Sequence, residues 1–112
     1  MKLITAFGGA NGLSIRQVGS SYGVFWADKE LDRFASYKDA APLLQDLSIS
    51  RIAAAGDELI GQLKFCENAF GEGGIVIVVG KAKDGYVVQR QGTRERFEVI
   101  ADELSDPPTF SF

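Results

Sequence analysis

The run Ile75-Val76-Ile77-Val78-Val79 decides the fold class of this chain. Five consecutive β-branched residues are typical of a strand with neighbours on both sides and little exposed surface. We therefore expect this run to be the central strand of a sheet. Turn residues at 83–85 and 91–93 separate it from two further strand-like runs, Tyr86 to Arg90 and Arg94 to Ile100. The pattern predicts a three-strand meander.

Two hairpins are predicted before the central strand. Residues 2–7 resemble a short strand, and the segment 8–12, with Asn-Gly at its end, predicts a tight turn into Leu13 to Val18. The aromatic and β-branched run Tyr22 to Ala27 is expected to pair with Leu13 to Val18 as a second hairpin. Val24 and Trp26 share one face of that strand and Phe25 shares the other, so the pattern leaves open which face is buried.

A long helix is predicted from Ile49 to Phe70, where apolar residues recur at alternating spacings of three and four. Leu59 and Leu63 lie on this stripe and are expected in the core. A shorter helix is predicted from Ala40 to Leu47, starting at Asp39, because a start at Ser36 would place Pro42 where it removes an intrahelical bond. The charged segment 27–34 is expected to connect strand and helix.

Together these elements predict an α+β fold of order βββ-αα-βββ. A mainly antiparallel sheet would pack on one long amphipathic helix and a short helix. Because 112 residues match the size of one domain, we expect a single domain over 1–112, with residues 106–112 as an extended tail.

Composition limits the cellular setting and the partners. Hydrophobic residues make up 46% of the chain, enough to build a core without disulfides, and Cys66 has no second cysteine to pair with. No signal-like or membrane-spanning apolar run is present, so a cytoplasmic location is expected. The net charge of −3 disfavours phosphate-rich partners.

Catalysis is not indicated by the residue types present. The chain has no histidine, which removes the commonest general base and metal ligand. Cys66 lies on the apolar stripe and is expected to be a small core residue. We therefore predict no catalytic residue, no cofactor, no metal site and no enzymatic activity.

The main functional hypothesis is a protein-interaction module that associates with itself as a homodimer, of the kind that inhibitors, immunity-type proteins and assembly adaptors represent. Gly61 and Phe65 are interface candidates, because a glycine inside a helix suggests close approach of another backbone. Phe110 and Phe112 are further candidates, since alternation in an extended tail places both rings on one surface.

Two alternatives remain open. A small-ligand pocket between helix and sheet would use Tyr22, Trp26 and Tyr86 at its mouth. A weak nucleic-acid site would use the basic residues Arg90, Arg94 and Arg96 of the last hairpin, although nearby carboxylates offset their charge.

Overall fold

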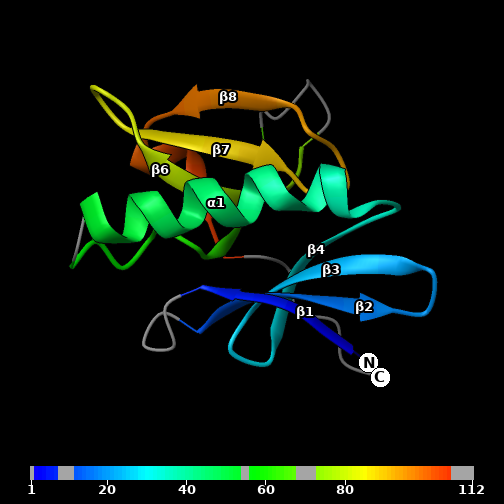
Figure 1. Ribbon diagram of the computed structural model, residues 1–112. Coiled ribbons are helices and arrows are strands. Elements are labelled where there is room, and N and C mark those ends of the chain that lie inside the picture. The colour runs from blue at the N-terminus through cyan, green and yellow to red at the C-terminus, as the bar shows by residue number, and fades with distance from the viewer. Residues whose placement is uncertain (1, 8–11, 54–55, 68–72, 107–112) are drawn as a thin grey trace.

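In the residues that the computed structural model describes, one helix lies between two antiparallel sheets (Figure 1). These residues are 2–7, 12–53, 56–67 and 73–106. The elements in chain order are β1 (Lys2–Phe7), β2 (Leu13–Val18), β3 (Ser21–Trp26), β4 (Lys29–Phe34), α1 (Tyr37–Ala53), β5 (Leu63–Cys66), β6 (Gly74–Lys81), β7 (Tyr86–Arg90), β8 (Arg96–Val99), the 3-10 turn η2 (Ala101–Glu103) and β9 (Leu104–Ser105). The predicted α+β class is confirmed, whereas the predicted single sheet and the order βββ-αα-βββ are wrong.

The first sheet is a meander in the order β1-β2-β3-β4. The predicted pairing of β2 with β3 is confirmed, with Ile15 opposite Val24. The segment 27–34, expected to be a connection, instead turns at Ala27 and forms the edge strand β4. Leu31 explains this strand, because it is fully buried among otherwise charged neighbours and so provides an inward-facing apolar anchor.

The second sheet has the order β8-β7-β6-β5-β9. Strand β6 contains the β-branched run and has β5 on one side and β7 on the other, as predicted. Val76, Ile77 and Val78 are each 0% exposed. The predicted meander through β7 and β8 is also confirmed.

The predicted long helix from Ile49 to Phe70 is wrong. Helix α1 ends at Ala53, and residues 63–66 form β5. Gly56 and Gly61 have φ angles of 94° and 90°, which a right-handed helix cannot contain. Ile49, expected on the buried stripe, is 57% exposed. Pairing of β5 with β6 and β9 therefore overrides the helical spacing.

The helix also begins earlier than predicted. The amide of Asp39 donates a hydrogen bond to the Ser36 hydroxyl at 3.2 Å, so Ser36 caps α1 and Tyr37 is its first residue. Pro42 lies inside the helix. The predicted short helix is thus the central part of one longer helix, and its expected buried residues Ala40, Leu44 and Leu47 are confirmed.

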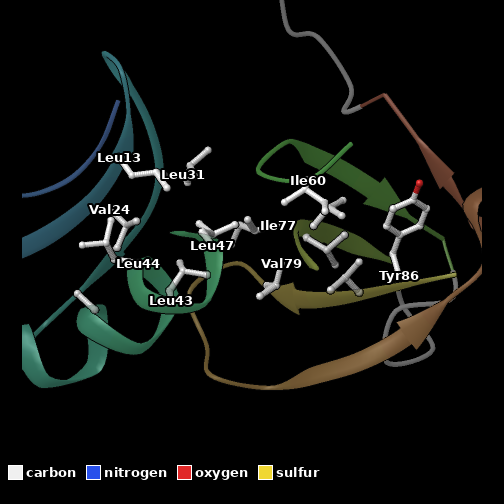
Figure 2. Packing of buried hydrophobic residues seen from close by; sticks show 14 of the residues in the cluster. Leu13, Val24, Leu31, Leu43, Leu44, Leu47, Ile60, Ile77, Val79 and Tyr86 are labelled. Atoms are coloured by element: carbon white, nitrogen blue, oxygen red, sulfur yellow. The ribbon is translucent and has the colours of Figure 1, made fainter. Parts of the chain in front are cut away.

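The core surrounds α1 on both sides. Figure 2 shows the leucines of α1 between side chains of the two sheets, and the labelled residues are Leu13, Val24, Leu31, Leu43, Leu44, Leu47, Ile60, Ile77, Val79 and Tyr86. Cys66 is buried, as predicted. Leu59 and Leu63, predicted core residues, are only half-buried and pack at its margin, whereas Ile60 between them is fully buried. The shift follows from the loss of helical geometry in this segment.

Candidate functional site

Trp26 and Arg51 form a stacked pair at the C-terminal end of α1. Trp26 is the last residue of β3, where it lies opposite Leu13 and Lys29. Arg51 occupies the last turn of α1, where the helix dipole favours a cation. Its guanidinium carbon lies 4.0 Å from the centre of the Trp26 ring. This distance is that of a cation–π contact.

Two neighbouring residues hold the pair in place. Arg51 Nη1 donates to the carbonyl of Ile60 at 3.2 Å. Gly61 lies against the indole, and a Cβ added there would be 3.1 Å from two carbons of the Trp26 ring. The Gly61 amide in turn donates to the Val78 carbonyl at 2.8 Å, which ties this backbone to β6. The stacked pair is therefore preorganised by the segment that follows α1.

A carboxylate, a phenol and an ammonium group meet beside this pair. The Tyr86 hydroxyl lies 3.0 Å from Asp57 Oδ2, and Lys81 Nζ lies 3.3 Å from the same oxygen. Lys81 Nζ is also 4.7 Å from the centre of the Tyr86 ring. Desolvation raises the pKa of Asp57, but hydrogen bonds from the Leu59 amide, Tyr86 and Lys81 outweigh it and leave that pKa below its ordinary value. Asp57 is therefore held as an anion at neutral pH.

Asp57 and the stacked pair border an open hollow of about 390 Å³. The residues that line it are Trp26, Arg51, Gly56, Asp57, Glu58 and Gln62. The hollow combines a half-buried indole, one guanidinium and two carboxylates. The Nε of Arg51 is buried and lacks a hydrogen-bond partner in the described part of the chain. The surface can thus accept a polar group and an apolar group side by side.

The structure brings together two of the three ligand-pocket candidates. Trp26 lines the hollow, and Tyr86 reaches its wall through Asp57. Tyr22 lies elsewhere: its ring meets Tyr37, the first residue of α1, edge to face at 6.3 Å. Tyr22 therefore lies near the start of α1, whereas the hollow lies near its end.

The interface candidates are also placed in different surroundings. Gly61 is buried, its amide bonds to the backbone of β6 within the same chain, and a Cβ added to it would meet the Trp26 ring. Phe65 is half-buried in β5, opposite Ile75 and Ser105. Phe110 and Phe112 lie outside the described residues.

The basic residues of the last hairpin lie partly against carboxylates of α1. Arg96 Nη1 is 2.6 Å from Asp46 Oδ2, and its Nε donates to the buried Gln89 at 2.8 Å. Arg94 Nη1 is 3.4 Å from Asp39 Oδ1. Arg90 is half-buried at the end of β7. The charge of Arg94 and Arg96 is therefore offset by the helix, and these contacts fasten β8 to α1.

Arg51 is the functional candidate that the sequence analysis misses. Its signal is the position of a basic residue in the last turn of a helix, which becomes visible only once the helix is known to end at Ala53. Asp57 and Glu58 lie in the segment 49–70 that is predicted as a helix, which ends at Ala53 in the structure.

Searches of protein-family models, curated proteins and solved structures found no match to this chain. Within the described ranges, no group of three His, Cys, Asp or Glu side chains is placed to hold a metal ion. Those ranges also contain no helix with the length and hydropathy needed to cross a membrane.

Proposed function

We propose that this chain is a non-enzymatic protein-interaction module that associates with a second copy of itself through the hollow around Trp26 and Arg51. The observation that carries the proposal is the preorganised Trp26–Arg51 stack in a hollow open to solvent. Tryptophan and arginine are enriched among the residues that dominate binding energy at protein interfaces. A pair that is already ordered also loses less conformational entropy on binding.

The charges of the hollow suit a twofold contact between identical surfaces. Arg51 is a cation, and Asp57 and Glu58 supply carboxylates within the same hollow. In an isologous dimer each copy presents the same patch, so one copy's cation can face the other copy's carboxylates.

The shape of the hollow supports a protein partner over a small ligand. Small-molecule sites enclose most of the ligand surface and are lined mainly by apolar groups. Here the lining is largely polar, and only Trp26 contributes an aromatic ring. Among the candidate ligand residues, Tyr22 is too distant to take part. The ligand-binding alternative is therefore less well supported than the protein-binding one.

The non-enzymatic and cytoplasmic parts of the proposal rest on residue types. The sequence contains no histidine, and its one thiol, that of Cys66, is buried where substrate cannot reach it. An unpaired cysteine is also compatible with a reducing compartment.

Sedimentation at increasing concentration tests the proposal. The full chain should form dimers, and Arg51→Ala should weaken them at least tenfold, the effect of a hot-spot residue worth more than about 1.4 kcal/mol. Arg16→Ala is the matched control and should leave association unchanged, because Arg16 does not line the hollow: its guanidinium stacks on Phe25 at 4.7 Å and bonds to the Ala27 carbonyl and Asp28. A full chain that stays monomeric at high micromolar concentration, or equal effects of both variants, would overturn the proposal.

A variant ending at Asp106 separates the tail from the hollow. If the phenylalanines Phe110 and Phe112 contribute to the same interface, truncation should weaken the dimer further. An undiminished dimer removes the tail from the interface and leaves the hollow as the proposed contact.

A further inference from the structure

The two sheets meet directly where the turn between β7 and β8 contacts β4. The amide of Gly92 donates to both carboxylate oxygens of Asp32, at 2.9 Å each. The side-chain amide of Gln91 donates to the carbonyl of the neighbouring residue, Leu31, at 2.8 Å. Two consecutive residues of the turn are thus bonded to two consecutive residues of the strand, 60 positions earlier in the chain.

Asp32 is an unusual group to find at such a junction. The residue is only 4% exposed, and no cation in the described part of the chain forms an ion pair with it. Its remaining hydrogen bond comes from the Arg33 amide at 2.7 Å. A buried carboxylate without a counterion is costly when ionised, and backbone amides offset only part of that cost.

The charged groups around Asp32 do not supply a counterion. Glu30, on the same strand, is an anion that acts on Asp32, and the Arg33 guanidinium is paired with Glu30 at 3.0 Å. The contacting turn residues are uncharged, as is Val24, which faces Asp32 on β3. Arg90 and Arg94 flank the turn, and Arg94 is paired with Asp39. The charged residues of α1 lie elsewhere. Lys38 is exposed, Asp39 pairs with Arg94, Asp46 pairs with Arg96, and Arg51 stacks on Trp26.

We propose that Asp32 and the β7–β8 turn form a proton-dependent latch between the two sheets. A protonated carboxyl keeps the turn closed on β4, and ionisation lets the turn open more often. Opening hydrates the carboxylate and releases the Leu31 carbonyl, which Gln91 otherwise occupies on this edge strand. The latch thus controls access to one edge of the first sheet.

The direction follows from the two states of the latch. Burial, foremost, and Glu30 raise the pKa of Asp32 in the closed state, and the amides of Gly92 and Arg33 only partly oppose them. In the open state the carboxyl is hydrated and its pKa returns toward the ordinary value. Closure is therefore favoured most below that ordinary value, and this preference is lost as pH rises through the closed-state pKa.

Nuclear magnetic resonance measures the latch directly. The carboxyl carbon of Asp32 should titrate above the ordinary range for aspartate. The Gly92 amide and the Gln91 side-chain amide should shift with the same midpoint, although Gln91 bonds to a neutral carbonyl. Opening, seen as loss of hydrogen-exchange protection after correction for the intrinsic rate, should rise about tenfold for each unit by which the closed-state pKa is raised.

Two variants keep the test decisive. Asp32→Asn retains a carbonyl acceptor for Gly92 but cannot ionise, so its opening should not depend on pH. Glu30→Gln leaves Asp32 intact but removes the neighbouring anion. It should lower the pH midpoint of the Asp32 titration and narrow the pH range over which opening changes. An Asp32 midpoint in the ordinary range, or a Gln91 side-chain amide that does not follow the titration, would overturn the latch even if Asp32→Asn fails to fold.

Discussion

The guanidinium of Arg51 stacks on the indole of Trp26, with 4.0 Å between its central carbon and the ring centre. These residues come from the last turn of the helix and the end of a strand of the first sheet. Residues 60 and 61 connect the pair to the second sheet: the Ile60 carbonyl accepts from Arg51, and the Gly61 amide donates to Val78 of β6. All three layers of the fold therefore converge on the proposed binding surface.

The position of Gly61 beside the Trp26 ring should not tolerate a side chain. We expect Gly61→Ala to destabilise the protein by more than Gly56→Ala, since both glycines have φ near +90° but only Gly61 has the Trp26 ring within 4 Å of an added Cβ. Gly56→Ala should cost about 1–2 kcal/mol, the strain of a left-handed alanine. Chemical denaturation of both variants measures the difference. Equal losses would show that Gly61 is required for its backbone angle alone.

Two isoleucines, one inside the core and one outside it, should differ in their contribution to the free energy of unfolding. Ile60 is fully buried and Ile49 is 57% exposed. Ile60→Ala should reduce the free energy of unfolding by about 2–5 kcal/mol, the cost of deleting buried methyl groups. Ile49→Ala should change it by less than about 0.5 kcal/mol. A large loss for Ile49→Ala would mean that this face of α1 is covered in solution.

The Tyr86–Asp57 hydrogen bond should make stability sensitive to acid. Because the pKa of Asp57 is lowered on folding, its contribution is fully present above the unfolded-state pKa and is lost as pH falls through the folded-state pKa. Tyr86→Phe removes one donor and should cost about 0.5–1.5 kcal/mol at neutral pH. The difference from the unmodified protein should shrink in acid.

Tyr22→Phe is the control for that measurement, since the Tyr22 ring has an aromatic contact of its own far from Asp57. Its effect on the free energy of unfolding should not change with pH across the carboxylate range. A Tyr86→Phe deficit that persists unchanged below this range would contradict the proposed role of the Asp57 anion.

Nucleic acids should bind weakly to the last hairpin. Asp46 and Asp39 lie 2.6 Å and 3.4 Å from Arg96 and Arg94, well inside a Debye length of about 8 Å at physiological salt. Titration with single-stranded RNA or DNA at that salt should give no submicromolar affinity. Tight binding that is lost in an Arg94→Ala/Arg96→Ala variant would promote the nucleic-acid alternative.

Most strands could be predicted from the sequence because their signals are local, whereas β4, β5 and β9 could not. The apolar run of β6 and the turn residues around β7 specify pairing with neighbours that are close in the chain. The centre of the helix could be predicted at residues 40–47, but its ends could not. Spacings of three and four after residue 49 mimic a helix, although Gly56 and Gly61 have positive φ angles and residues 63–66 form β5. Pro42 adds to the error, because it favours a helix start at Asp39, whereas Ser36 caps α1 and Pro42 lies inside the helix.

The candidate site depended on that helix boundary. Trp26, Gly61 and Tyr86 could be selected from residue type alone, but for separate roles in a pocket and an interface. Their convergence requires α1 to end at Ala53, so that Arg51 reaches Trp26 and Asp57 reaches Tyr86. The spacing of residues along the chain does not indicate contacts between residues that are far apart in it.

Trp26 is the one tryptophan in the sequence, so its fluorescence reports on the proposed surface without a label. If two copies associate through the hollow, Trp26 emission should move to shorter wavelength and resist acrylamide quenching as concentration rises into the high micromolar range. Arg16→Ala should behave in the same way, and Arg51→Ala should require higher concentration for the same change. Emission and quenching that stay constant at every concentration would contradict self-association through this surface.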